Sequence, residues 1–336
     1  MRGNNLKFEN TISDAVSRIR FAPKSNNLLI SSWDSNLRLY DVDSSVLRLE
    51  SSSEAGAALL DCCFQNELVA FSAGSDNCIR RYNLDSGVHD EIGQHDDFVS
   101  SVEFSDETNQ LITAGWDKTI RSWDTRSMNM LDCLNTNGAE AESVAISGFK
   151  LIVAVGSSVN IYDLRNFKES THTKELFMGV HIRCVRPIHN SEGFVAGSID
   201  GRIAIEYFNS TDMGYVFWCH PKSKDGRHHV VAVNDIAFNP FISGAFATGD
   251  NKGYVLTWDA QSKRRLLQLP RYSSSVASLS YNCGGQLLAV ACSHTYKEEN
   301  EIERPPQISI HDIDNLYNDS VSAGNSRLKK IAQDTM

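Results

Sequence analysis

The hydrophobic positions along this chain form short alternating runs with a period of two. In residues 95–126 three such runs are separated by turns, at Phe98–Phe104, Gln110–Gly115 and Thr119–Trp123. Alternation of apolar and polar residues is typical of a strand with one buried face. The segment ends on an aromatic residue followed by an acidic or amide residue, and this ending recurs at Tyr40-Asp41, Tyr82-Asn83, Trp123-Asp124, Tyr162-Asp163 and Trp258-Asp259.

The spacing of these endings predicts seven repeated units. The first four closing aromatics lie 39 to 42 residues apart, close to the roughly 40–45-residue period of a WD-repeat blade of four strands. The interval from Tyr162 to Trp258 has room for two units, and residues 195–208 supply the missing one, with Glu206 in the aromatic position. A degenerate last unit covers Val276–Ile313. We therefore expect an all-β, seven-bladed WD-repeat β-propeller.

A ring made from a single chain must complete one blade with a strand from the other terminus. We expect Leu6, Lys7 and Phe8 to form an outer strand beside Ile308–Ile310, because closure hides sheet edges. The propeller is predicted to cover residues 1–315. The polar residues 316–336 are predicted to form a disordered tail.

One unit carries four residues that meet inside a WD-repeat blade, namely His95, Thr113, Asp117 and Trp123. In such a blade the aspartate accepts a hydrogen bond from the histidine, which reaches the hydroxyl, which reaches the indole N–H. A buried polar chain of this kind stabilises the blade when every member is present.

Composition narrows the functional classes. The net charge of −10 argues against binding nucleic acid or anionic membranes through bulk charge. We find neither a membrane-span-length apolar run nor an N-terminal signal pattern. The eight cysteines include no CxxC pair and suggest reduced thiols inside the cell rather than zinc ligands or disulfides. No phosphate-binding loop, serine elbow or metalloprotease motif is present, so we expect a non-enzymatic protein without a cofactor.

Two tryptophans stand where WD repeats usually have a small polar residue. Trp33 precedes Asp34 and Trp116 precedes Asp117 in equivalent turns, so both indoles should project from one face of the disc. An exposed aromatic side chain is a good binding anchor. The alternative is that each indole packs against a neighbouring turn.

Several stretches carry a family resemblance. SSWDSNLRLYD, GWDKTIRSWDTR, IYDLRN and GSIDGRIAIEYF followed by FWCH are similar to the "Bub-three" family of WD-repeat proteins of the mitotic spindle checkpoint. The resemblance spans nearly the whole chain. The SIDGR stretch followed by a Cys-His pair is shared with one sister family, an mRNA-export factor that docks on a nucleoporin.

The resemblance implies an adaptor that binds short peptides. Family members hold the GLEBS motif of checkpoint kinases and read phosphorylated Met-Glu-Leu-Thr (MELT) repeats of the kinetochore scaffold. It implies peptide-binding roles for Trp33 and Trp116, and a contact from Arg202 to phosphothreonine; a guanidinium suits phosphate because its fork donates two hydrogen bonds. The alternative for Arg202 is a solvated turn residue. The implied location is the nucleus, with kinetochores in mitosis, and also the cytoplasm; microtubule-associated partners remain open.

One position departs from the family pattern. The family usually has a lysine or arginine just before the Cys-His pair, where this chain has Trp218. The loss of one cation should weaken phosphate binding, by about 1–3 kcal/mol. Either Lys222 or Lys224 from the following basic stretch compensates, or this chain has partly lost phosphopeptide reading.

Two other functions stay open. WDTR and YDLR place Arg126 and Arg165 in the WDxR pattern through which many propellers join the adaptor of a cullin ubiquitin ligase. Arginines at these positions also make purely structural contacts. The third hypothesis is mRNA export through a nucleoporin, as in the sister family.

Overall fold

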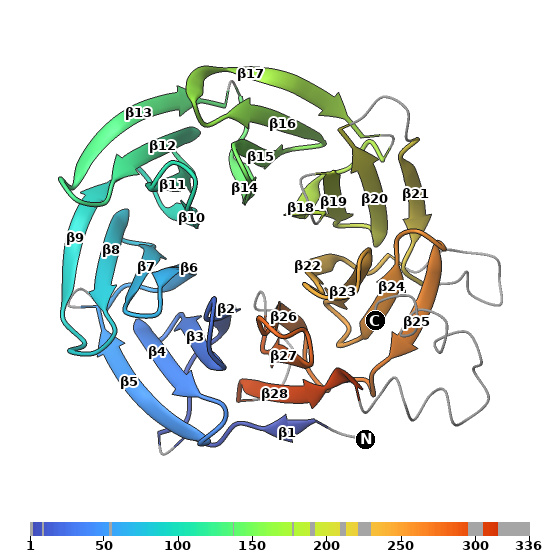
Figure 1. Cartoon of the computed structure of the whole chain (residues 1–336), viewed down its shortest axis with the longest axis horizontal. Coiled ribbons are helices and arrows are strands. Elements are labelled where there is room, and N and C mark those ends of the chain that lie inside the picture. Colours follow the sequence, from blue (N-terminus) through green and yellow to red (C-terminus); the bar gives the residue numbers. More distant parts are fainter. Residues whose placement is uncertain are drawn as a thin grey trace.

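The chain folds into seven four-stranded antiparallel sheets arranged around a central axis, as Figure 1 shows. The computed structural model describes residues 3–8, 10–53, 56–136, 138–176, 178–188, 192–208, 213–220, 230–294 and 305–314. The predicted seven-bladed propeller is confirmed. Lys222, Lys224, the basic stretch around them and the predicted tail lie outside the described residues.

Each blade runs from an innermost first strand to an outermost fourth strand. Blades 1 to 4 consist of β2 (Val16–Phe21), β3 (Asn27–Ser32), β4 (Asn36–Asp41) and β5 (Val46–Ser52); β6 (Leu59–Asn66), β7 (Val69–Gly74), β8 (Cys78–Asn83) and β9 (His89–Gln94); β10 (Val99–Ser105), β11 (Gln110–Gly115), β12 (Thr119–Asp124) and β13 (Asn129–Asn135); and β14 (Ala141–Ser147), β15 (Lys150–Val155), β16 (Ser158–Asp163) and β17 (Asn166–Glu175).

Blades 5 to 7 repeat this order, and the last blade takes its outer strand from the N-terminal region. They consist of β18 (Ile182–Pro187), β19 (Gly193–Ser198), β20 (Arg202–Tyr207) and β21 (Tyr215–Trp218); β22 (Val233–Phe238), β23 (Ala245–Asp250), β24 (Val255–Asp259) and β25 (Arg264–Gln268); and β26 (Val276–Tyr281), β27 (Leu287–Cys292), β28 (Gln307–Asp312) and β1 (Asn4–Asn5).

The closing strand begins earlier than the sequence suggested. β1 pairs Asn4 with Ile310 and Asn5 with Ser309, and one further backbone bond joins the Leu6 N–H to the Ile308 carbonyl at 2.8 Å. The expected strand at residues 6–8 was therefore wrong beyond Leu6, although its partner was right. The chain leaves the sheet edge because Phe8 packs against Tyr40, with ring centroids 5.3 Å apart.

The hydrophobic core lies between neighbouring blades rather than at the centre of the ring. Seven clusters of buried side chains each draw on two adjacent sheets; Ile112 of blade 3, for example, shares a cluster with Val153 of blade 4. Each sheet is thus covered on both faces, as a closed ring allows. In most blades the third strand carries an aromatic residue near its end, and this residue pairs with the second strand. Two blades lack it and have Glu206 (blade 5) and His311 (blade 7) at this position.

The turn between the second and third strands is tight in several blades. Its last residue has a positive φ, at Ser35 (71°), Asn77 (69°), Lys118 (63°) and Gly201 (94°), as in hairpin loops that end in a left-handed residue. An aspartate directly precedes each of these residues. The turn therefore fixes the direction of the residue before the aspartate, where both tryptophans stand.

Among the described residues no helix has the length and apolar character needed to span a membrane.

Candidate functional site

The second-to-third-strand turns lie on one face of the disc. In blades 1, 3 and 5 the residue after the second strand donates its N–H to the residue that precedes the first strand: Trp33 to Ala15 at 2.8 Å, Trp116 to Phe98 at 2.8 Å, and Ile199 to His181 at 3.1 Å. Since all seven sheets follow the same path around the ring, these turns share a face, called the entry rim here. The side chains of Trp33, Trp116 and Arg202 all start from it.

The indole of Trp33 is half-buried. It makes an edge-to-face contact with His294 of blade 7, with ring centroids 5.8 Å apart, so the packing alternative holds in part for this residue. Asp34 beside it is fixed by the Arg38 guanidinium at 2.8 Å. Burial opposes ionisation of Asp34, but hydrogen bonds from Arg38 and Ser32 outweigh it and lower the pKa of the carboxyl. The Trp33 turn is therefore rigid.

The indole of Trp116 is far more accessible, with 50% of its surface exposed. Its ring lies 5.3 Å from that of Phe98, which is 37% exposed and comes from the loop entering the same blade. The turn below is held by Asp117, which accepts hydrogen bonds from the Thr119 hydroxyl at 2.8 Å and from Arg121 at 2.9 Å. Trp116 is thus a large apolar side chain on a rigid base.

Asp117 also begins the hydrogen-bonded chain of blade 3. His95 Nδ1 lies 3.0 Å from the Asp117 carboxylate, His95 Nε2 lies 2.8 Å from the Thr113 hydroxyl, and the Trp123 indole N–H donates to the same hydroxyl at 2.8 Å. With the imidazole proton on Nδ1, every donor in this chain finds an acceptor. Burial lowers the pKa of His95 despite the adjacent carboxylate. The imidazole is therefore neutral at physiological pH.

Arg202 is engaged with its own blade. Its Nε donates to Asp200 at 2.9 Å and its Nη2 lies 2.7 Å from the same carboxylate, while Nη2 also donates to the Met178 carbonyl at 2.5 Å. The guanidinium lies over the ring of Trp218, 5.3 Å from its centroid, and the side chain is 19% exposed. Trp218 therefore stacks on Arg202 at the position where the family pattern has a second cation. The edge of the guanidinium formed by Nε and Nη2 is already paired with the Asp200 carboxylate.

The Cys-His pair has a structural function that sequence reasoning missed. His220 Nε2 lies 2.7 Å from Asp250, and the Trp258 indole N–H donates to Thr248 at 3.0 Å. Thr248 and Trp258 match Thr113 and Trp123 of blade 3, whereas Asp250 is the last residue of β23 and so precedes the turn position that Asp117 occupies. Blade 6 therefore has only part of the tetrad pattern of blade 3, and His220 pairs with an aspartate of a strand instead of a turn. The available signal was the threonine of TGD, followed by the closing Trp258.

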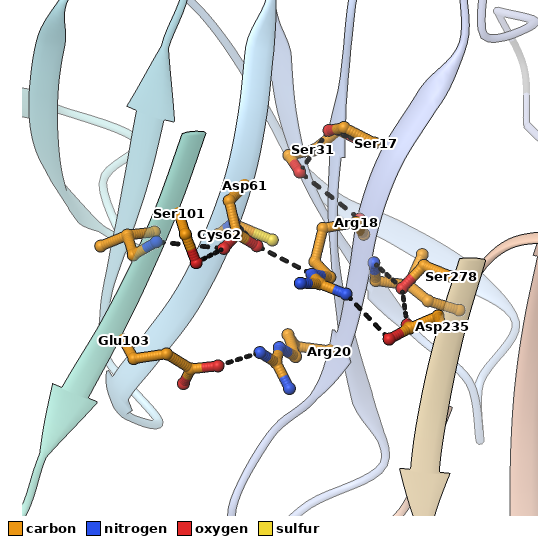
Figure 2. Close-up of polar contacts among 12 residues, drawn as sticks. Ser17, Arg18, Arg20, Ser31, Asp61, Cys62, Ser101, Glu103, Asp235 and Ser278 are labelled. Carbon is orange, nitrogen blue, oxygen red and sulfur yellow. Dashed lines mark hydrogen bonds and ion pairs between the residues drawn. The ribbon is translucent and has the colours of Figure 1, made fainter. Parts of the chain in front are cut away.

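A belt of charged side chains around the central axis was also missed. Arg18 of β2 binds Asp61 of β6 at 2.8 Å and Asp235 of β22 at 3.1 Å, as Figure 2 shows. Asp235 also pairs with Arg186 of β18 at 2.6 Å. Nearby, Arg20 pairs with Glu103 of β10. These ion pairs join innermost strands of different blades.

The two arginines of the WDxR pattern lie on the opposite rim, in the turns after β12 and β16. Arg165 pairs with Asp163 at 2.6 Å and lies over the Phe149 ring, 4.7 Å from its centroid. The Arg126 N–H donates to Asp124 at 2.9 Å. Both residues thus make contacts within their own turns.

All eight cysteines are free thiols, and six of them are buried. Among the described residues no group of histidine, cysteine and carboxylate side chains could hold a metal ion.

Comparison with known proteins places this arrangement in a family. The family model for the WD domain, G-beta repeat, matches residues 6–41 and 89–124. The chain is 50% identical over 314 residues to the mitotic checkpoint protein BUB3.3 of Arabidopsis thaliana, covering 93% of this chain and 99% of that protein. The chain belongs to the BUB3 family of mitotic checkpoint proteins.

More distant relatives follow. Mitotic checkpoint protein BUB3.1 of Arabidopsis thaliana is 39% identical over 319 residues, covering 92% of this chain and 93% of that protein. Protein Rae1 of Drosophila melanogaster is 27% identical over 330 residues, covering 92% of this chain and 94% of that protein. Membership in the BUB3 family makes this propeller a non-enzymatic WD-repeat adaptor.

Proposed function

We propose that this protein is a spindle-checkpoint adaptor whose entry rim binds an extended GLEBS-type segment of a checkpoint kinase. The observation that carries the proposal is the placement of Trp33 and Trp116 on one rim, each beside an aspartate fixed by an arginine. Rigid aromatic side chains contribute much of the binding energy in peptide interfaces because little conformational entropy is lost.

Phosphopeptide reading is proposed to contribute less than peptide docking. The Nε and Nη2 atoms of Arg202 already contact Asp200, so a phosphate must compete with that carboxylate. The stacked Trp218 supplies no positive charge. A phosphorylated MELT repeat of a kinetochore scaffold would then gain only part of the affinity that a two-cation pocket gives.

The place in the cell where we propose that this protein acts follows from its proposed partners. An adaptor that brings checkpoint kinases to a kinetochore scaffold acts in the nucleus and at kinetochores during mitosis, with a further pool in the cytoplasm. Microtubule-associated proteins remain candidate partners on the same rim.

Calorimetric titration of a GLEBS-type kinase peptide tests the docking proposal. We expect Trp116→Ala to weaken binding by about 2 kcal/mol, or roughly thirtyfold, because truncation of an interface tryptophan has this order of effect. Trp33→Ala should cost less, since His294 already covers part of its ring. The control is Phe241→Ala, which removes a 64% exposed ring from the opposite rim. Absence of peptide binding to the intact protein refutes the proposal.

Phosphate reading is measured with phosphorylated and unphosphorylated MELT peptides on the wild type and Arg202→Ala. We expect the phosphate to raise affinity less than tenfold and Arg202→Ala to abolish the difference. Equal affinities in the wild type would place phosphate reading outside this protein.

The two other functions receive less support. Arg165 is bound to Asp163 and Phe149, so a ligase adaptor would have to displace these contacts. Identity to the Rae1 protein is 27%, against 50% for a mitotic checkpoint protein, which favours the checkpoint over mRNA export.

A further inference from the structure

Phe98 occupies a special position on the entry rim. Within the part of the chain that the structure describes, a backbone hydrogen bond joins the residue after the second strand to the residue before the first strand in six blades. Trp33 meets Ala15 and Trp116 meets Phe98 in this way; the remaining pairs are Ser75 with Ala58, Ile199 with His181, Asn251 with Ala232 and Ser293 with Ser275. Among these six pairs, only blade 3 has large aromatic side chains on both sides.

The two rings of blade 3 form an exposed shelf, defined here as Phe98 and Trp116. Their centroids are 5.3 Å apart and their planes meet at 44°. They retain 37% and 50% of their surface in contact with solvent. Trp33, in the same position of blade 1, is instead partly covered by His294. An exposed pair of aromatic side chains on a rigid turn offers its faces to a ligand.

The charged groups around the shelf have a negative excess. Asp96 and Asp97 directly precede Phe98, and both are exposed; the side chain of Asp96 is 85% exposed. Arg121 is shared between Asp96 at 2.8 Å and Asp117 at 2.9 Å. Lys118 is the other cation of this turn.

Asp96, Asp97 and Asp117 are three carboxylates, whereas Arg121 and Lys118 are two cations. One negative charge is therefore left over beside the aromatic faces. His95 adds none, because its imidazole is buried and hydrogen-bonded as a neutral group.

We propose that the Phe98–Trp116 shelf binds a lysine or arginine side chain of the extended partner peptide. Aromatic faces attract a cation through the ring quadrupole, and Asp96 and Asp97 add charge complementarity that favours a basic residue over an acidic one. The inference rests on the proposed docking of a peptide along the entry rim, and it specifies the side chain that this peptide presents to blade 3.

The first test is independent of any partner protein. In the full-length protein with 15N-labelled tryptophan, the indole signal of Trp116 is assigned from Trp116→Phe and followed during titration with N-acetyl-lysine amide. The matched probe is the same molecule acetylated on its side-chain nitrogen, which has no charge. We expect the charged probe to shift the Trp116 signal at concentrations at least about fivefold lower than the neutral probe, since a cation–π contact of about 1 kcal/mol corresponds to this ratio.

Three variants test whether the preference for the charged probe arises at the shelf. Phe98→Leu keeps an apolar side chain but removes the ring, and it should abolish the preference for charge. Asp96→Asn combined with Asp97→Asn should reduce it, while Phe241→Leu on the opposite rim should leave it unchanged. Equal shifts by both probes, or an unchanged preference in Phe98→Leu, would overturn the proposal.

The second test uses the kinase peptide itself. Each lysine and arginine of a GLEBS-type peptide is replaced singly by alanine, and affinity is measured for the wild type and Phe98→Leu. One replacement should weaken binding about fivefold in the wild type and hardly at all in Phe98→Leu. If the peptide binds but no basic residue couples to Phe98, the shelf proposal fails and the adaptor proposal stands. If no peptide binds while the lysine probe shifts Trp116, the adaptor proposal fails and the shelf remains.

Discussion

Replacement of Asp235 by asparagine should strongly destabilise the ring. The Asp235 carboxylate is completely buried and faces Arg18 at 3.1 Å and Arg186 at 2.6 Å. It also accepts bonds from the Ser278 hydroxyl and the Leu279 N–H of blade 7, both at 2.9 Å. Burial opposes ionisation, but the two guanidinium charges prevail and hold the pKa of this carboxyl at about 2.

The loss of stability expected for Asp235→Asn depends on which arginine is left without a charged partner. Arg18 keeps Asp61 as a partner, whereas the other bonds of Arg186 go to the Val185 carbonyl and the Ser143 hydroxyl, both uncharged. Breaking a buried ion pair and leaving one charge uncompensated costs about 3–5 kcal/mol. We expect Asp235→Asn to lose this much free energy of unfolding in urea titrations followed by tryptophan fluorescence.

Two companion variants separate charge from packing. Asp235→Asn combined with Arg186→Met removes the orphaned cation and should recover part of the loss. Asp163→Asn breaks an ion pair whose arginine is 64% exposed, so it should cost less than about 1 kcal/mol. A loss below about 1 kcal/mol for Asp235→Asn, or a double variant less stable than the single one, would show that the charged belt does not join the blades as argued.

Further predictions concern the blade interiors and the phosphate site. Thr113→Val should cost about 2–4 kcal/mol in the same urea assay, because it leaves the Trp123 indole and His95 without their buried partner. Thr257→Val is its matched control: the Thr257 hydroxyl is buried without a hydrogen-bond partner, so the change should be neutral or slightly stabilising, and equal losses would contradict the reasoning. Burial lowers the pKa of His311 to about 4, whereas an unfolded histidine titrates near 6.5. Between about pH 6.5 and pH 4 the unfolded chain therefore binds a proton that the folded chain does not, and the stability lost as pH falls is on the order of 3 kcal/mol. His311→Gln should flatten this part of the stability profile, and an unchanged slope would exclude His311 as its source. Trp218→Lys restores a cation beside Arg202 and should raise affinity for a phosphorylated MELT peptide several-fold without affecting the unphosphorylated one; equal affinity changes for both peptides would contradict it.

The repeat pattern revealed the fold because each blade carries its own local signal. Tyr40, Tyr82, Trp123 and Tyr162 all close third strands at the same register against the second strand. Position within the repeat also identified the turns that carry Trp33 and Trp116. The closing strand was misplaced because Leu6 and Phe8 look like strand residues, whereas Phe8 packs between blades 7 and 1.

The central belt could not be predicted, because its members are far apart in sequence and meet only when the ring closes. Arg18, Asp61 and Asp235 occupy the third position of their innermost strands, a coincidence that becomes meaningful only when the blades are superimposed. Phe98 was missed for another reason. It was counted as the first residue of a strand, but the strand begins at Val99 and leaves the ring of Phe98 on the rim.

The junction between β1 and β28 has a consequence for synthesis on the ribosome. Asn4 and Asn5 are made long before their partners Ile310 and Ser309. Blades 1 to 6 can form in turn as the chain emerges, but blade 1 and blade 6 each keep one apolar flank bare until β26, β27 and β28 arrive between them. A nascent chain that stalls before residue 307 is therefore an incomplete ring with an exposed apolar sheet face at each end. Such products should depend on chaperones or be degraded.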